Sequence, residues 1–319
     1  MKDGCGREIS YLRISVTDRC DLRCVYCMPE AGVEPLSHAE ILRYEEIQRL
    51  ATIFASLGVK KIRLTGGEPL TRAGLPGLLA AIRNTPGIET LALTTNGMLL
   101  EDALPALVSA GLDAVNISLD TLREDTFQSI TRRNGVERVL RAIDAACAVP
   151  RLTVKLNCVP TDRNMTELPA LARFAAQRHI PLRFIELMPI GEGKNVQGLS
   201  EAAVTSILEA AFGPMTLRAA GGADKCRRFM LPDGGEIGFI SAMSHRFCKD
   251  CNRVRLTAAG YLKTCLQFDT GVDLKALLNK DDDTIRAAIR TAILQKPAQH
   301  HFEEASPDCD DRKMSQIGG

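Results

Sequence analysis

The chain has 319 residues, and its 40 Lys and Arg residues nearly match its 39 Asp and Glu residues, which gives a formal net charge of +1. This length suits two domains or one large α/β domain, and the balanced charge means that any polyanionic ligand must be met by locally placed cations. No segment approaches the run of about 20 apolar residues that spans a bilayer, and the N-terminal segment MKDGCGREIS lacks the apolar core of a signal peptide, so we expect a cytoplasmic protein.

Strand-like apolar runs alternate with amphipathic helical patterns from residue 10 to about residue 212, which predicts βα units around a parallel sheet. The six strand candidates cover residues 11–16, 61–65, 90–94, 114–119, 152–159 and 182–188. The helical patterns include residues 47–57, 78–82, 104–107, 136–146 and 168–176. Six βα units are too few to close an eight-stranded barrel. We therefore expect an α/β fold in the form of an open, three-quarter parallel β/α barrel.

The βα rhythm stops after about residue 212, where Gly213 and Pro214 mark a boundary. A short strand pattern at residues 236–240 and helical patterns at residues 274–278 and 285–294 follow it. The sequence therefore predicts a first domain over residues 1–212 and a smaller C-terminal α+β domain over residues 213–319.

Polar and apolar side chains alternate along the predicted strands, and alternate side chains of a strand point to opposite faces of a sheet. In the first strand, Leu12, Ile14 and Val16 oppose Arg13 and Ser15. The same separation holds over residues 61–65, 114–119 and 152–159, and it weakens over residues 182–188. A packed barrel interior would be aliphatic, and unpaired buried cations are costly. The interior is therefore predicted to hold water and a polyanion.

Three cysteines near the N-terminus, Cys20, Cys24 and Cys27, follow the spacing C-x3-C-x2-C, with Tyr26 directly before the last. A cubane iron–sulfur cluster usually takes four cysteines, so three would leave one iron open to a further ligand, as in catalytic metal sites. A zinc loop or three buried core thiols are the alternatives, and the charged residues among the thiols make a core unfavourable. The 11 cysteines of a cytoplasmic chain indicate metal ligands rather than disulfides.

A second set, Cys248, Cys251 and Cys265, has the spacing C-x2-C-x13-C. His245 lies three residues before Cys248 and would complete a Cys3His zinc tetrahedron. Spacing alone therefore favours zinc and a second iron–sulfur cluster about equally.

Arg253 and Arg255 lie between the last two of these cysteines, on one face of a predicted strand. Two arginines beside a metal site suit a bound anion or a purine edge, although such a pair taken alone is more often solvated surface charge. With this context the whole chain resembles the radical S-adenosylmethionine (SAM) superfamily and, within it, the GTP 3′,8-cyclase family, also called molybdenum cofactor biosynthesis protein A. The resemblance is carried by LRISVTDRCDLRCVYCMPE, KKIRLTGGEPLTR, LTTNG, VNISLD, VKLNCV, RFIELMPIGE, the second cysteine set and the terminal SQIGG.

The resemblance implies two [4Fe-4S] clusters, SAM as cofactor and GTP as substrate. The implied cluster ligands are Cys20, Cys24 and Cys27 for the first and Cys248, Cys251 and Cys265 for the second. The implied SAM-binding residues are Tyr26, Gly66, Gly67, Glu68, Ser118 and Met188. The implied GTP-binding residues are Arg13, Lys61, Arg63, Thr94, Lys155, Arg183, Arg253, Val254 and Arg255. A catalytic role is implied for Arg13, Arg253, Arg255 and a double-glycine tail that enters the active site, Gly318 and Gly319.

The implied activity is a lyase reaction that converts GTP into (8S)-3′,8-cyclo-7,8-dihydroguanosine 5′-triphosphate, the first step of molybdenum cofactor biosynthesis. Reductive cleavage of SAM would give a 5′-deoxyadenosyl radical that abstracts hydrogen from ribose C3′, and the carbon radical would attack guanine C8. The implied partners are a low-potential electron donor of the flavodoxin or ferredoxin class and cyclic pyranopterin monophosphate synthase, which would take over the product. The resemblance implies neither a nucleic-acid partner nor a membrane partner, and it is compatible with a homodimer.

Two other functions share part of these motifs. A radical SAM peptide-modifying enzyme with an auxiliary cluster predicts further cysteines and a peptide groove. A non-catalytic metal scaffold would have no use for an inner wall of cations. The single auxiliary cysteine set, the cationic wall and the terminal glycines favour the nucleotide reaction.

Overall fold

The structure is a computed structural model that describes residues 1–218, 226–302 and 312–318. A twelve-stranded sheet has the order β12-β11-β10-β1-β2-β3-β4-β5-β6-β9-β8-β7. Its six central strands are parallel, and all six were predicted from the sequence. They are β1 (Tyr11–Ser15), β2 (Lys61–Thr65), β3 (Thr90–Thr95), β4 (Ala114–Ser118), β5 (Thr153–Cys158) and β6 (Leu182–Ile185).

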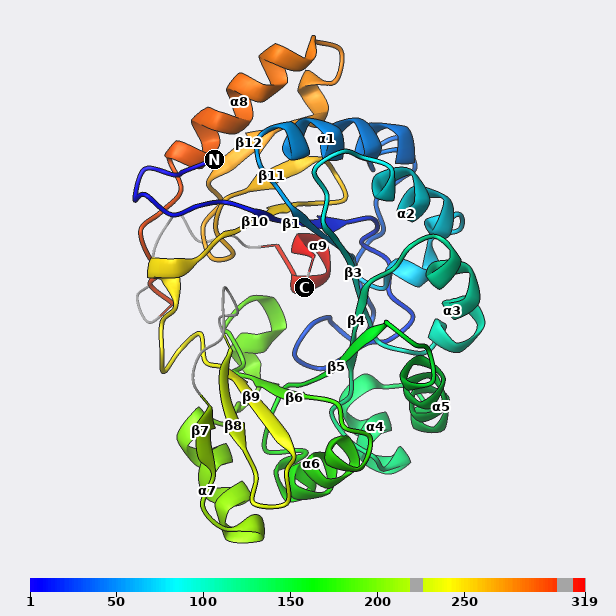
Figure 1. Ribbon diagram of the computed structural model, residues 1–319, viewed down its shortest axis with the longest axis vertical. Helices are drawn as coiled ribbons and strands as arrows, with labels where there is room; N and C mark the ends of the chain where they lie inside the picture. Colours follow the sequence, from blue (N-terminus) through cyan, green and yellow to red (C-terminus); the bar gives the residue numbers. More distant parts are fainter. Residues whose placement is uncertain (219–225, 303–311, 319) are drawn as a thin grey trace.

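Helices lie outside the curved sheet and leave a central space on its inner side (Figure 1). They are α1 (Tyr44–Ser56), α2 (Leu75–Arg83), α3 (Leu100–Ser109), α4 (Glu124–Thr131), α5 (Val136–Cys147) and α6 (Leu168–Gln177). The sequence pattern did not indicate α4, because this helix is short, is polar overall and buries only Phe127, Ile130 and Thr131. The other five agree with the predicted helical patterns.

The C-terminal part of the chain extends both edges of the same sheet. At one edge, β10 (Arg253–Leu256) pairs parallel to β1 and is followed by antiparallel β11 (Tyr261–Lys263) and β12 (Gly271–Asp273). At the other edge, β9 (Glu236–Ile240) pairs parallel to β6 and is followed by antiparallel β8 (Arg227–Met230) and β7 (Thr216–Arg218). The strand order has two ends, so the barrel is open over the described residues.

The remaining helices are α7 (Glu201–Phe212), α8 (Asp282–Leu294) and α9 (Met314–Ile317). The helical pattern expected at residues 274–278 is instead a single 3-10 turn, Lys275–Leu277. Because the C-terminal strands complete the sheet of the N-terminal part, the division at residue 212 does not separate two sheets. That domain division stays a prediction.

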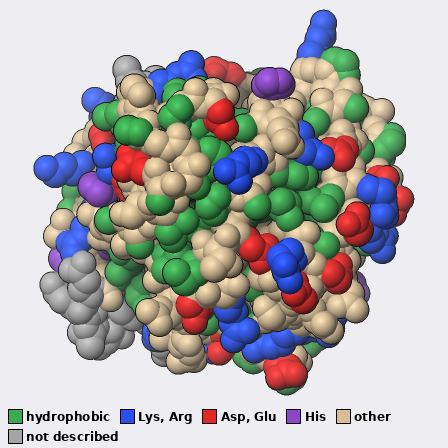
Figure 2. Space-filling model, turned by 90° about the horizontal axis from the view of Figure 1, so that it is seen from below, with side chains coloured by type: hydrophobic (Ala, Val, Ile, Leu, Met, Phe, Trp, Pro, Cys, Tyr) green, Lys and Arg blue, Asp and Glu red, His purple; other side chains and the backbone are tan. Residues whose placement is uncertain are grey.

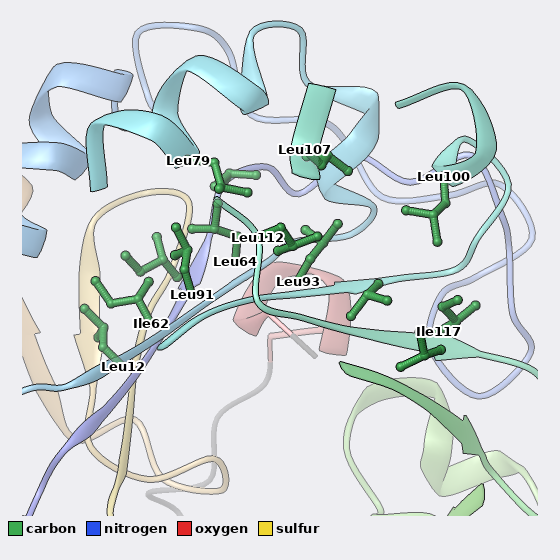
Figure 3. Close-up of a cluster of buried hydrophobic side chains, with 14 of the residues drawn as sticks. Leu12, Ile62, Leu64, Leu79, Leu91, Leu93, Leu100, Leu107, Leu112 and Ile117 are labelled. Carbon is green, nitrogen blue, oxygen red and sulfur yellow. The ribbon is translucent and has the colours of Figure 1, made fainter. Parts of the chain in front are cut away.

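The apolar faces of the strands pack against the helices, as the alternation predicted. Leu12 of β1, Ile62 of β2 and Leu93 of β3 are fully buried beside Leu79 of α2 and Leu107 of α3 (Figure 3). Burial of such leucine side chains contributes about 1.5–3 kcal/mol each to folding. The polar residues of the same strands therefore point the other way, into the central space.

The outer surface mixes the two signs of charge. Figure 2 shows acidic and basic side chains interspersed over one face of the molecule, in keeping with the net charge of +1. None of the helices in the described part of the chain is long and apolar enough to cross a membrane.

Candidate active site

A cavity of about 680 Å³ lies on the inner side of the sheet. Its lining includes all six predicted cluster cysteines, all six predicted SAM-binding residues and all nine predicted GTP-binding residues. The structure therefore brings together motifs that are spread from residue 13 to residue 265.

The loop after β1 holds the first three cysteines, Cys20, Cys24 and Cys27. The amide of Cys27 donates to the carbonyl oxygen of Cys24 at 2.9 Å and closes a turn between them. The loop is tied to the end of α4, because the amide of Arg23 donates to Thr131 O at 2.9 Å. Burial raises the pKa of all three thiols, that of Cys27 to about 11. Bound iron would supply the positive charge that stabilises buried thiolates.

Tyr26 is held in place by Asp120, which follows β4. The Tyr26 hydroxyl donates to Oδ2 of Asp120 at 2.6 Å, and the amide of Val159 donates to Oδ1 at 2.8 Å. The sequence analysis missed Asp120, although it shares its strand parity with Ser118 and lines the same cavity. The aromatic ring before the third cysteine is therefore fixed relative to the sheet.

The turn after β2, Gly66 to Glu68, packs directly on the first cysteine loop. The amide of Gly67 donates to Thr17 O at 2.8 Å, and that of Glu68 donates to Arg19 O at 2.7 Å. A Cβ atom at Gly67 would meet the carbonyl of Arg19 and lie 2.7 Å from that of Asp18. Only glycine permits this close approach.

The carboxylate of Glu68 is fully buried and accepts three hydrogen bonds. The donors are Leu70 N at 3.0 Å, Thr95 Oγ1 at 2.8 Å and Asn96 N at 2.7 Å. Burial raises the pKa of Glu68 to about 7, although these hydrogen bonds favour the ionised form. A carboxylate has about four acceptor positions, so Glu68 fixes the turn and retains capacity for one donor of a ligand.

The second cysteine set comes from two neighbouring loops at the edge of the sheet. Cys248 opens the 3-10 turn Cys248–Asp250, Cys251 lies two residues before the start of β10, and Cys265 lies two residues after the end of β11. All three are partly buried and line the cavity. The strand pairing of β10 with β1 and with β11 thus brings the second set to the same cavity as the first.

Two buried cations that the sequence analysis missed hold the backbone around this second set. Arg7 Nη1 donates to Cys248 O at 2.9 Å, and its Nε pairs with Asp3 at 2.5 Å. Lys296 Nζ donates to Arg253 O at 3.0 Å and to the carbonyl of Thr264. No sequence pattern marks these two residues, because their partners are backbone carbonyls of distant segments.

His245 does not join the second cysteine set. Its Nδ1 lies 3.3 Å from Glu201 Oε2, and Arg227 Nη1 lies 3.3 Å from its Nε2. Within the described residues, no three His, Cys, Asp or Glu side chains converge on one metal ion. The thiols of a cubane bind different irons and stand farther apart than the ligands of one zinc ion. The structure therefore does not bring His245 to the three cysteines as the Cys3His zinc site would require.

Cations cover the inner face of the sheet in two rows across β10, β1 and β2. In the order β10, β1, β2, the first row is Arg253, Tyr11 and Lys61, in which Tyr11 is uncharged. The second row is Arg255, Arg13 and Arg63. Lys155 and Arg183 extend this wall on β5 and β6. Burial, together with repulsion among the arginines, lowers the pKa of Arg13 and that of Arg255, the latter to about 10. A bound polyanion would favour the charged form of both arginines, because an opposite charge offsets burial and the repulsion among the cations.

The C-terminal tail enters the same region. The short helix α9 (Met314–Ile317) lies in the central space, and its first residues line the cavity (Figure 1). Gly318 has a left-handed backbone (φ 84°), and its carbonyl accepts a hydrogen bond from Arg255. A Cβ atom there would lie 2.9 Å from Ser15 Cβ. Gly319 lies outside the described residues.

Comparisons with known proteins agree with this arrangement. A model of the radical SAM superfamily matches residues 14–175, and a model of the molybdenum cofactor synthesis C domain matches residues 180–302. The chain is 47% identical to the GTP 3′,8-cyclase of Pelotomaculum thermopropionicum and 43% identical to that of Clostridium perfringens, over the full length of each chain. The chain belongs to the GTP 3′,8-cyclase family.

Solved structures show the same fold at low identity. The SuiB protein of Streptococcus suis bound to S-adenosylmethionine matches 90% of this chain and 68% of its own, at 16% identity and a TM-score of 0.67. Its complex with the precursor peptide SuiA gives a TM-score of 0.63 over 97% of this chain and 76% of its own. This likeness supports the open radical SAM barrel. Membership of the superfamily implies SAM and a [4Fe-4S] cluster for this chain.

Proposed function

We propose that this chain is a lyase that converts GTP into (8S)-3′,8-cyclo-7,8-dihydroguanosine 5′-triphosphate, in the first step of molybdenum cofactor biosynthesis. One observation carries the proposal. A single cavity is lined by two three-cysteine sets and by a wall of arginines and lysines. The family relationship at 47% identity over the full chain supports the same activity.

The first cluster would be held by the cysteines of the β1 loop, and SAM would lie beside it. The Gly66–Glu68 turn would receive the methionine end of SAM, and Tyr26, Ser118 and Met188 would contact the rest. When bound, the cluster and SAM supply the one-electron chemistry that removes hydrogen from ribose C3′. The Tyr26–Asp120 hydrogen bond at 2.6 Å and the tight Gly67 contact give these residues fixed positions.

A second [4Fe-4S] cluster would be held by Cys248, Cys251 and Cys265, and its open iron would take the guanine. The two cationic rows would hold the triphosphate, and Thr94, Lys155, Arg183 and Val254 would complete the GTP site. Arg13, Arg253 and Arg255 would neutralise the charge of the nucleotide next to the reacting atoms. Bidentate arginine contacts suit phosphate oxygens.

The tail would close the cavity around both substrates. Gly318 lies between Ser15 and Thr65 of adjacent strands and contacts Arg255, so it would order the arginine beside GTP. Gly319 would follow it into the site. A reaction that removes hydrogen from one ribose carbon requires this kind of exact positioning and the exclusion of water.

The chemistry of the proposed reaction indicates its electron donor, the enzyme that uses its product and its cellular compartment. One electron from a low-potential donor of the flavodoxin or ferredoxin class would start each turnover, and cyclic pyranopterin monophosphate synthase would use the product. We place the enzyme in the cytoplasm, where reducing conditions keep cluster cysteines available. Residues 1–212 would form the radical SAM domain, and residues 213–319 would supply the second cluster and complete the GTP site.

The test is an anaerobic incubation of the reconstituted protein with SAM, GTP and a reductant. The cyclised product is an isomer of GTP, because the hydrogen lost from C3′ is balanced by one electron and one proton. We therefore expect a new chromatographic peak with the mass of GTP and an equimolar amount of 5′-deoxyadenosine. Deuterium placed at C3′ of GTP should appear in the 5′-deoxyadenosine.

Cluster content provides a separate check. Two cubanes correspond to about eight irons per chain after reconstitution, whereas a colourless protein with one stoichiometric zinc would contradict the second cluster. Deuterium-free 5′-deoxyadenosine and no new nucleotide would point to another substrate. Modification of an added peptide would then support the radical SAM peptide-modifying alternative, and no SAM cleavage at all would support a metal scaffold.

A further inference from the structure

Tyr11 is the one uncharged side chain in the two cationic rows on β10, β1 and β2. In the strand register it lies between Arg253 and Lys61, and Arg13 follows two residues later on the same face. Neighbouring strands are only about 4.8 Å apart, so a third cation at this position would add strong repulsion. A phenol at this point separates the flanking cations.

Tyr11 contacts three of these cations at once. Its hydroxyl oxygen accepts a hydrogen bond from Arg63 Nε at 2.7 Å. Its ring centroid lies 5.2 Å from Lys61 Nζ and 5.8 Å from the guanidinium carbon of Arg253, which are distances of cation–π attraction. One side chain therefore holds cations from both neighbouring strands.

The hydrogen bond to Tyr11 fixes the direction of Arg63. A guanidinium has five N–H donors in a rigid plane. For Arg63, Nε donates to Tyr11, and Nη1 donates to Leu93 O at 2.7 Å and to Thr94 Oγ1 at 3.2 Å. Among the described residues these contacts engage Nε and Nη1 and leave Nη2 for a ligand in the cavity.

We propose that Tyr11 is a positioning residue for GTP that orients Arg63, Lys61 and Arg253 toward the triphosphate. This inference rests on the proposed function, because it takes GTP as the ligand of the cationic wall. Tyr11 acts through these cations, and its loss should affect binding of the phosphates more than binding of SAM.

Because the Tyr11 hydroxyl can ionise, its role should make the GTP affinity depend on pH. Burial raises the pKa of a tyrosine, but Arg63, Arg13, Arg253 and Lys61 outweigh this effect and lower the pKa of Tyr11 to about 7. These cations face it from β1, β2 and β10. A bound triphosphate would offset their charge, so it would raise the pKa of Tyr11 and favour the neutral phenol. By linkage, GTP affinity should fall as pH rises above about 7.

The experiment measures GTP, GMP and SAM affinities of the anaerobic holoprotein by calorimetry at about pH 6 and about pH 8.5. Tyr11→Phe keeps the ring and removes the acceptor for Arg63. At about pH 6 it should weaken GTP binding about fivefold, the effect of one lost hydrogen bond, and leave SAM affinity unchanged. GMP, which lacks the outer phosphates, should bind with a smaller loss. Between the lower and the higher pH, GTP affinity should decrease less in this variant than in the unmodified protein.

Tyr44→Phe is the matched control, because Tyr44 donates to Ala73 O at 3.0 Å on the outside of the barrel. It should bind GTP like the unmodified protein at both pH values. Equal GTP affinity of Tyr11→Phe and the unmodified protein at both pH values would overturn the inference and leave the proposed function intact. If the unmodified protein binds SAM but not GTP, both the inference and the proposed function fail.

Discussion

Replacing Gly318 by alanine should displace the C-terminal tail from the cavity. Gly318 has a φ of 84°, and a left-handed backbone costs a residue with a side chain about 1–2 kcal/mol. The added Cβ would also lie 2.9 Å from Ser15 Cβ and 3.0 Å from Thr65 Oγ1. Both neighbours belong to buried central strands and cannot easily move.

The backbone cost alone lowers the equilibrium constant for docking of the tail roughly 5- to 30-fold. When the tail leaves, Arg255 also loses the Gly318 carbonyl as an acceptor, and hydrogen bonds to charged groups contribute about 1.5–3 kcal/mol each. We therefore expect product formation to fall by at least about fivefold. Cluster content and SAM affinity should change much less, because the Gly66–Glu68 turn is held by Thr17 and Arg19 and the first cysteine loop by Thr131, although the Ser315 backbone of the tail also hydrogen-bonds to Cys27.

The assay compares cyclised nucleotide, iron content and SAM affinity in one anaerobic preparation of each variant. Gly234→Ala is the matched control, because Gly234 has a φ of 90° and open space where the Cβ would lie. It carries the same backbone cost without the clash or the cavity contact. If Gly318→Ala turns over GTP at the rate of the unmodified protein, the tail has no role in positioning the reactants.

Replacing Cys24 by alanine should abolish SAM cleavage, whereas Cys265→Ala should retain some SAM cleavage without cyclised nucleotide. Measuring 5′-deoxyadenosine and nucleotide products together checks both, and coupled turnover in either variant would contradict the ligand assignment. Removing the cation of Arg63 or Lys155 should weaken GTP binding by about 1.5–3 kcal/mol per lost contact. Calorimetry checks this, and unchanged affinity in both variants would refute the cationic wall. Leu93→Ala should lower the free energy of unfolding by about 2.7–5 kcal/mol, measured in urea, and a loss near zero would contradict its burial.

The sequence by itself determined the six central strands, their two faces and the position of the cysteine-bearing loops. The predicted range 61–65 is β2, and the predicted polar set of Arg13, Arg63 and Lys155 lines the cavity. These predictions succeed because alternation along a strand and spacing within a loop are local properties of the chain. The weaker alternation near Arg183 still left that residue on the cavity wall.

Only the tertiary structure decided which distant segments share the site. The pairing of β10 with β1 brings Arg253 and the second cysteine set beside Tyr11, and it turns separate cations into two rows. The packing of Glu201 against His245 removes the histidine that spacing alone offered to zinc. Such contacts depend on how remote surfaces fit together, and no local pattern encodes them. The sequence therefore specified the chemical groups, and the fold decided which of them line one cavity.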